Sequence, residues 1–425
     1  MLRAIHITKL FNLFDYPINL NNEEGITILT GPNGYGKTTI LKIIHAIARK
    51  NFFYFLKLSF KKITLIFDDS SLNITLEKKS TNNYTIRQGK KPSLSISRES
   101  LDKQLQIILR ERFFRQIDED KWIDRRNDNI FDISTLIERV IPELSEYQHG
   151  LFENGFPSIP DVYLIREQRL LKRIQRKRSR QYYSEDEMIN HFGETIEEYA
   201  KELKDHITDT LATNSQITQE LDSSFPRRLF EERNEISEED FNIRFEKIKE
   251  IQKALNKYEL SVIREDNHPT YKKENAKALM VYLNDTEAKL EVFHKLLEKL
   301  DLFTGILNER RFAFKKIQIS KEDGFKFLTK DNNPLSLTDL SSGEQQEVVL
   351  LFELLFKVKP GTLVLIDEPE ISLHVAWQKE FLNDLIKVTE LQRINTIIAT
   401  HSPQIINERW DLTLDLEELI HEKVS

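Results

Sequence analysis

Two groups of residues, at opposite ends of this 425-residue chain, have the types and spacing needed for phosphate chemistry. The first is Gly31-Pro32-Asn33-Gly34-Tyr35-Gly36-Lys37-Thr38, which matches the pattern G-x-x-x-x-G-K-[ST] of a phosphate-binding loop. Its glycines let backbone N–H groups turn inward around phosphate oxygens. Lys37 would reach the β- and γ-phosphates of ATP, and the Thr38 hydroxyl would contact Mg2+. The residues expected to contact the nucleotide are Asn33, Gly34, Tyr35, Gly36, Lys37, Thr38 and Thr39.

The second group is Asp367-Glu368, which follows the apolar run Leu363 to Ile366. An unbroken apolar run of this kind is typical of a buried parallel strand, and ligands bind at the carboxyl ends of such strands. We expect Asp367 to hold the magnesium through a water and Glu368 to direct the water that attacks the γ-phosphate. The alternative is a turn that ends the strand, for which Pro369 alone would be sufficient.

The elements that must position these residues can be predicted from the spacing of apolar side chains. Ile26 to Leu29 is a short apolar run of strand type that leads into the glycine-rich loop. Ile40 to Ala48 follows as a helix, whose N-terminus would add its positive dipole end to the phosphate site. A glycine-rich turn that binds nothing is the alternative for the loop, and the later motifs argue against it.

Two further motifs accompany these groups in the second half of the chain: Leu340-Ser341-Ser342-Gly343-Glu344, and Ala399-Thr400-His401-Ser402-Pro403. Together with the loop and the carboxylates, and in this order, they resemble the motifs of ABC-type ATPases. Within that family the chain resembles the branch that includes SMC, Rad50 and OLD-like proteins. The resemblance covers the two ends of the chain and leaves the middle to other arguments.

The resemblance implies roles for these motifs. His401 would sense the γ-phosphate, and Gln168, after the strand-like run 161–165, would touch the magnesium. A signature loop would bind the phosphate of a nucleotide held by the other subunit, so a chain with one set of motifs is expected to homodimerise around ATP, with higher oligomers left open. The residues of this loop are Ser341, Ser342, Gly343 and Glu344. Ser342 stands where many members have glycine, and a simple helix cap remains the local alternative for the loop.

Composition limits the class of protein. Apolar residues make up 39% of the chain, enough for a core, and the 31% of charged residues indicates extensive solvated helix. The chain has no cysteine, so we expect neither disulfides nor thiolate metal sites. We found no long uncharged apolar stretch and no signal-like start, and therefore expect a cytoplasmic protein without membrane spans.

A basic run at Arg169 to Arg180, followed by Tyr182 and Tyr183, contrasts with the net charge of −7. Such a run could neutralise the phosphates of DNA or RNA, with the tyrosines available for stacking. It could equally be a solvated linker between two parts of the chain.

The expected fold class is α/β, an ABC-type P-loop head with a mixed sheet and a β-rich lobe, built from segments such as 63–67 and 72–76. We expect the head to comprise 1–183 and 302–425, with a helical insertion at 184–301. Within the insertion, apolar residues recur at helical spacing in 241–258 and in 290–300, which predicts a short antiparallel hairpin. The turn is expected at Asn267-His268-Pro269, because proline stops a helix.

Looser similarities indicate one group of proteins within this family. The segment 221–229, which interrupts the helical pattern, together with 163–170 and 409–412, resembles segments of the ATPases of Septu and related retron antiphage systems. In those systems the ATPase works with a separately encoded HNH nuclease. OLD proteins instead carry a nuclease domain after the head, whereas only about two dozen residues follow His401-Ser402-Pro403 here, too few for a domain. The tail is expected either to complete the head or to dock a partner.

The resulting hypothesis is an ATPase that dimerises around ATP and gates a nuclease partner in antiphage defence. Two rivals stay open. One is a DNA-repair ATPase that binds DNA when ATP is present, and the other is a weakly hydrolysing scaffold that sequesters its partner.

Overall fold

The chain divides into two compact units, of which the first comprises 1–169, 173–184 and 358–425 and the second comprises 170–172 and 185–357. The computed structural model describes residues 1–21, 23–111, 113–118, 121–125, 130–137, 160–166, 185–260, 269–309, 312 and 314–421. The first unit combines both ends of the chain. The stretch 302–357, which we expected in the head, belongs by its contacts to the unit that contains the long helices. The division into head and insertion stays a prediction.

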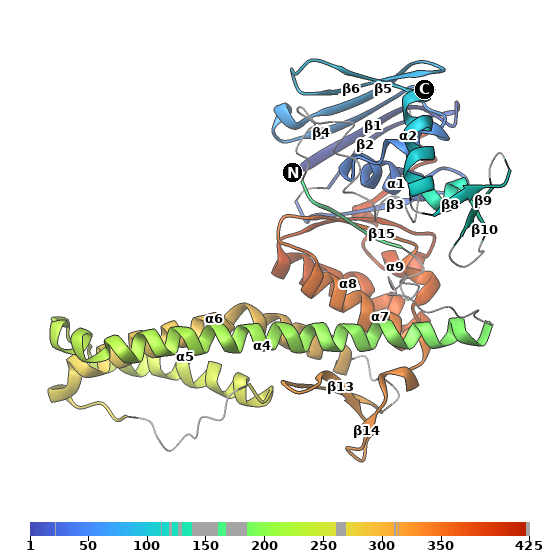
Figure 1. The fold of residues 1–425 in the computed structure, drawn as a ribbon. Coiled ribbons are helices and arrows are strands. Elements are labelled where there is room, and N and C mark those ends of the chain that lie inside the picture. Colours follow the sequence, from blue (N-terminus) through green and yellow to red (C-terminus); the bar gives the residue numbers. More distant parts are fainter. Residues whose placement is uncertain are drawn as a thin grey trace. The chain divides into compact units, whose positions relative to one another are not determined.

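An antiparallel sheet of six strands forms the β-rich lobe of the first unit, in the order β2-β1-β4-β5-β6-β7 (Figure 1). Its strands are β1 (Leu2–Leu10), β2 (Phe14–Asn19), β4 (Lys62–Phe67), β5 (Ile74–Ser80), β6 (Asn83–Gln88) and β7 (Leu94–Ser97). In β4 the buried residues alternate with partly exposed ones, which is the pattern of a sheet that covers the core with one face. The expected strand at 72–76 begins two residues later, because Ser70–Leu72 form a 3-10 turn capped by Asp69.

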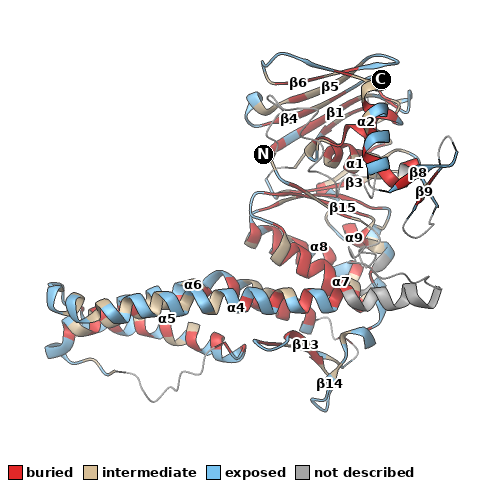
Figure 2. Cartoon of the chain, viewed as in Figure 1, coloured by how far each residue is buried: buried red, intermediate tan, exposed pale blue. Residues whose placement is uncertain are grey.

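A second sheet of the first unit is parallel throughout, in the order β11-β15-β16-β3-β17. Its strands are β3 (Ile26–Thr30), β11 (Val162–Ile165), β15 (Leu363–Asp367), β16 (Asn395–Ala399) and β17 (Thr413–Asp415). All five residues of β15 are buried, as expected for a strand with both faces covered. Figure 2 shows the same concentration of buried residues along this sheet.

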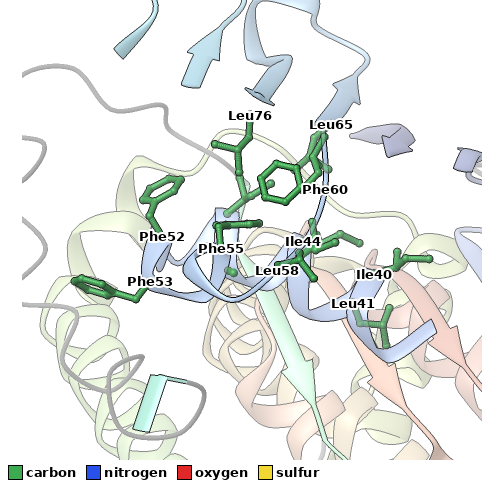
Figure 3. Packing of buried hydrophobic residues seen from close by; sticks show 14 of the residues in the cluster. Ile40, Leu41, Ile44, Phe52, Phe53, Phe55, Leu58, Phe60, Leu65 and Leu76 are labelled. Carbon is green, nitrogen blue, oxygen red and sulfur yellow. The ribbon is translucent and has the colours of Figure 1, made fainter. Parts of the chain in front are cut away.

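The helix α1 (Lys37–Ala48) supplies apolar side chains to a core that also includes residues of both sheets. Ile40, Leu41 and Ile44 of this helix are fully or almost fully buried, and Figure 3 shows them beside the aromatic turn η1 (Phe52–Leu56). Phe60, Leu65 and Leu76 of the antiparallel lobe lie in the same cluster. Because each buried side chain of this size stabilises the fold by about 1.5–3 kcal/mol, the cluster fixes α1 at its position beneath the phosphate loop.

Smaller elements complete the first unit. They are α2 (Arg98–Glu111), the sheet of β8 (Phe114–Gln116), β9 (Lys121–Asp124) and β10 (Ile130–Asp132), α3 (Ile133–Thr135), η9 (Pro369–Ser372), α8 (Val375–Gln392), α9 (Pro403–Ile406), η10 (Trp410–Leu412) and α10 (Glu418–His421). Of these, α8 lies along the parallel sheet on the side away from α1 (Figure 1).

Three long helices build most of the second unit: α4 (Glu185–Glu231), α5 (Glu238–Lys257) and α6 (Ala276–Glu309). The predicted hairpin is present, because α5 packs on α6, and α4 packs on α6 as well. Of its expected turn, only Pro269 is among the described residues.

The prediction that 221–229 interrupts the helical region is wrong, since this segment is helical inside α4 despite Pro226. The guanidinium of Arg228 donates to the carbonyl oxygen of Leu221 and pairs with both carboxylate oxygens of Asp285 on α6. The contact with Asp285 ties this part of α4 to α6, beside the position where proline cannot make its helix hydrogen bond.

The remaining elements of the second unit pack on α4, on α6 or on one another. It contains η6 (Lys273–Asn275), the sheet of β12 (Lys316–Ser320), β13 (Gly324–Leu328) and β14 (Pro334–Leu335), η7 (Leu337–Asp339), and α7 (Ser342–Phe352), which continues as a π-helical turn, η8 (Glu353–Lys357). Tyr199 of α4 stacks on Phe352, and its hydroxyl donates to a carboxylate oxygen of Glu353 at 2.6 Å. The end of α7 is therefore fastened to α4.

Candidate functional site

The glycine-rich loop joins β3 to α1 in a conformation that its glycines make available. Gly31 and Gly36 have φ angles of 129° and 89°, which other residues rarely adopt, and Gly36 is the residue before the first turn of α1. A Cβ atom on Gly36 would lie 3.1 Å from the side chain of Leu10, so the loop is also close to β1. Asn33 and Gly34 are exposed, and Thr39 is half-buried in the first turn of α1. The glycines thus allow the tight turn on which the predicted phosphate-binding loop depends.

Lys37 lies inside the loop, with a relative exposure of 5%. Its ammonium donates to the carbonyl oxygens of Gly31 at 2.7 Å and Pro32 at 3.2 Å, and lies 3.3 Å from Nδ1 of His401. Burial lowers the pKa of Lys37, and surrounding carboxylates oppose this effect. Those carboxylates belong to Glu368, Glu370, Asp415 and Asp367. The loop therefore holds a buried cation, and carboxylates surround this cation.

Thr38 and Asp367 meet across the space between α1 and β15. The Thr38 hydroxyl donates to Oδ1 of Asp367 at 2.8 Å, and Asp367 is buried. Hydroxyl and carboxylate oxygens are the ligands that Mg2+ prefers, so this pair fits the magnesium that the sequence predicted. The magnesium would be held by these two side chains, and it would neutralise charge on the phosphate oxygens.

Glu368 has a left-handed backbone conformation, with φ 44° and ψ 59°. Such a conformation in a residue other than glycine costs on the order of 1–3 kcal/mol and is most common at functional sites. The N–H of Glu368 donates to the carbonyl oxygen of Ala399 at 2.9 Å, which secures the strained residue to the end of β16. No sequence pattern predicted this conformation.

The segment around His401 follows β16 and is tied to its surroundings by backbone groups. The N–H of Thr400 donates to the carbonyl oxygen of Leu29, and the N–H of His401 donates to Oε1 of Glu370 at 2.7 Å. His401 itself is exposed. Sequence reasoning gave Glu370 no role, because its partner lies 31 residues further along the chain.

The C-terminal tail contributes to the phosphate loop. β17 pairs with β3, and the Thr30 hydroxyl donates to Asp415 at 3.2 Å. The hydroxyl of Tyr35 donates to Glu417 at 3.2 Å, and this hydrogen bond raises the pKa of Tyr35. Of the two alternatives for the tail, its completion of the head is therefore confirmed for these residues.

The predicted signature loop lies in the second unit, before α7. Ser341 and Glu344 form a capping box, in which the Ser341 N–H donates to Glu344 at 2.7 Å and the Ser341 hydroxyl accepts from the Glu344 N–H. The ammonium of Lys315 donates to both oxygens of the Glu344 carboxylate, at 2.9 and 2.8 Å. Ser342 and Gly343 occupy the first turn of α7. Sequence reasoning missed Lys315, which shares no motif with its partner.

Two sequence predictions cannot be placed on this framework. Gln168 and the basic run Arg169 to Arg180 lie outside the described residues. Among the helices that are described, none has the length and apolar character needed to cross a membrane.

Comparison with known proteins assigns the chain to a family. A family model described as "AAA domain, putative AbiEii toxin, Type IV TA system" matches residues 26–407. Protein ea59 of Escherichia phage lambda is 36% identical over 93 residues, which is 22% of this chain and 18% of ea59. The match therefore spans about a fifth of the length of that relative.

Two similar solved structures are head domains of SMC proteins. The SMC head domain from Thermotoga maritima is 11% identical with a TM-score of 0.35, over 97% of this chain and 94% of that one. An Smc head domain with a coiled coil and joint, derived from Pyrococcus yayanosii, is 11% identical with a TM-score of 0.34, over 100% and 99%. Similarity at this level carries no argument about function.

The family model decides the assignment, because it covers most of the chain. The matched stretch begins at the strand before the phosphate loop and extends past Asp367, Glu368 and His401. The chain therefore belongs to this AAA-domain family and is an ATPase that uses ATP and Mg2+.

Proposed function

We propose that this chain is the ATP-hydrolysing subunit of an antiphage defence system, which dimerises around ATP and regulates a separately encoded nuclease. The observation that carries the catalytic part is the convergence of side chains from separate elements. Lys37 and Thr38 begin α1, Asp367 ends β15 and His401 follows β16, yet their polar atoms lie within 2.8–3.3 Å of one another in pairs. Ligands bind at the carboxyl ends of the strands in such sheets, so a shared nucleotide accounts for this gathering.

Each residue has one task in this proposal. Lys37 binds the β- and γ-phosphates, and it would exchange its present carbonyl partners for phosphate oxygens. Thr38, Asp367 and Gln168 form the magnesium site. Glu368 accepts a proton from the attacking water, and His401 contacts the γ-phosphate.

The dimer follows from the loop at Ser341 to Glu344, because it opens α7 and the N-terminal end of this helix would face a nucleotide bound by a second copy. Two heads, each made of 1–183 and 302–425, would then enclose ATP. The helical insertion at 184–301 would contact the partner or nucleic acid, together with the basic run at 169–180.

The antiphage role is supported by the family description, by the relative and by similar segments. The description of the matched family names a putative toxin of a type IV TA system, and the relative ea59 is a phage protein. Segments of the chain resemble Septu and retron ATPases, whose output is an HNH nuclease in another chain. A cytoplasmic location agrees with such a task.

Replacement of Glu368 by glutamine tests the catalytic assignment. We expect the rate of ATP hydrolysis to fall at least 100-fold while ATP binding persists, because the amide cannot accept the proton. E390Q, which changes an exposed glutamate on α8, serves as the matched control and should keep the wild-type rate. A hydrolysis rate in E368Q equal to that of the control would refute the role of Glu368.

Co-purification from the native operon, with and without ATP, tests the biological assignment. A stoichiometric HNH nuclease, identified by mass, together with loss of phage protection in K37A, would support the proposal. Recovery of the chain alone, with binding to DNA only when ATP is present, would favour a repair ATPase. Protection that is insensitive to E368Q would favour a static scaffold.

A further inference from the structure

Two loops that follow neighbouring strands of the parallel sheet are joined by side chains. β15 and β16 are adjacent, so the segment after Asp367 and the segment after Ala399 leave the sheet side by side. The carboxylate of Glu370, from the first loop, accepts the N–H of His401, from the second, at 2.7 Å. A hydrogen bond from a backbone amide to a charged carboxylate is among the stronger kinds in proteins.

In the described part of the chain, the side chain of Glu370 makes this one hydrogen bond, and its charge also acts on Lys37. Its second oxygen, Oε2, is buried and meets no hydrogen-bond donor among the described residues. Burial of a carboxylate oxygen without a hydrogen-bond donor costs free energy. The hydrogen bond between the other oxygen and His401 is the contact that offsets this cost. The contact fixes the backbone of His401.

A second bridge between the same loops comes from Gln378 on α8, a residue that is 9% exposed. Its amide nitrogen donates to the carbonyl oxygens of Glu370 and Leu373, both at 3.1 Å. Its amide oxygen accepts the hydroxyl of Ser402 at 3.0 Å. Every polar atom of this side chain is therefore used to hold the two loops together.

His401 is contacted both at its ring and at its backbone. Nδ1 of the His401 ring lies 3.3 Å from the ammonium of Lys37, and the backbone N–H of His401 donates to the carboxylate of Glu370. We propose that Glu370 is a positioning residue, which acts through His401 to align it with the phosphate site, and that Gln378 holds Glu370 in place. This inference rests on the proposed role of His401.

A double-mutant cycle tests the inference with the full-length protein. Replacement of Glu370 by alanine (E370A) should lower kcat for ATP hydrolysis by about 10- to 100-fold and change the affinity for ATP less than 3-fold. In a protein that already carries H401A, the same replacement should change kcat less than 3-fold. E370Q, which keeps an oxygen able to accept the N–H, should recover most of the lost rate.

Hydrogen exchange separates a positioning role from a general loss of structure. E370A should accelerate exchange of the amide of His401 by at least 10-fold and leave that of residues 363–366 in β15 unchanged. The inference is overturned if E370A reduces kcat equally with and without His401, or if E370Q is as slow as E370A, since the charge would then be what matters. Inactivity of the wild type would instead reject the proposed function, before any comparison of variants.

Discussion

Removal of the ammonium of Lys315 should destabilise the second unit by about 2 kcal/mol. The ammonium contacts both oxygens of Glu344, whose side chain is 6% exposed, while that of Lys315 is 21% exposed. Loss of one partner of a fully buried pair costs about 3–5 kcal/mol, and loss of an exposed pair costs less than about 1 kcal/mol. Because Lys315 is partly exposed, we expect the loss of unfolding free energy in K315M to lie between these limits. Glu344 would keep only its contacts with Ser341.

The prediction includes a dependence on pH. Burial raises the pKa of Glu344, but Lys315 and the Ser341 groups lower it by more, so the pKa is below its ordinary value. A carboxylate of this kind stabilises the fold above its ordinary pKa of about 4.3, and this stability is lost as the pH falls through the lowered value. We therefore expect a smaller difference between wild type and K315M at pH 3.5 than at pH 7.

Urea denaturation followed by circular dichroism is the suitable assay. All three tryptophans, Trp122, Trp377 and Trp410, belong to the first unit, so tryptophan fluorescence would not report on the helices of the second. K321M is the matched control, because Lys321 pairs with Glu322 at 3.8 Å on the surface and its loss should cost less than about 0.5 kcal/mol.

The decisive variant combines K315M with E344Q. A buried charge without its partner is worse than a neutral pair, so the double variant should be more stable than K315M alone. If the double variant is the less stable of the two, or if K315M matches K321M, the reasoning about this pair is refuted.

Three further predictions concern the packing of both units. Y199F should lower the stability by about 2 kcal/mol in thermal denaturation, because the carboxylate of Glu353 would lose a buried donor; an unchanged melting temperature would contradict this. G324A should lower the free energy of unfolding, measured in urea, by about 3 kcal/mol. The glycine has a φ of 74°, and a Cβ atom at this position would lie 1.9 Å from the carbonyl oxygen of Ala200. A loss below about 1 kcal/mol would show that the strand can shift. Burial, together with the charges of nearby arginines, lowers the pKa of His45 to about 4. Below about pH 6.5 the unfolded chain binds a proton at this residue that the folded chain does not bind. The free energy of unfolding should therefore fall by about 3 kcal/mol between pH 6.5 and pH 4. H45Q should lack this part of the pH dependence, and an identical slope in both proteins would count against the assignment.

The parts of the site that sequence reasoning predicted are those fixed by local chemistry. The loop at Gly31 to Thr38 needs glycines at set positions, and the carboxylates need a buried strand in front of them, so both can be recognised within a few residues. The same holds for β3 and β15, whose apolar runs predicted strands close to their observed bounds.

Contacts between distant residues could not be predicted in this way. Lys315 and Glu344 are 29 residues apart, and Glu370 and His401 are 31 apart, with no spacing rule that links them. The helical state of 221–229 was missed for a related reason, because Asp285 of another helix pairs with Arg228 inside this segment. Periodicity describes one element at a time and is silent about what a neighbouring element contributes.

The pairing of β3 has a consequence for synthesis on the ribosome. Both neighbours of β3 in the sheet, β16 and β17, come from the last part of the chain, and the contact between Thr30 and Leu414 spans 384 residues. At roughly 5–20 residues per second, translation would leave β3 without either neighbour for about 20–80 s. The antiparallel lobe needs only residues up to Ser97 and can form long before. During that interval the nascent chain presents a strand with both edges open, which is the kind of segment that chaperones shield from aggregation.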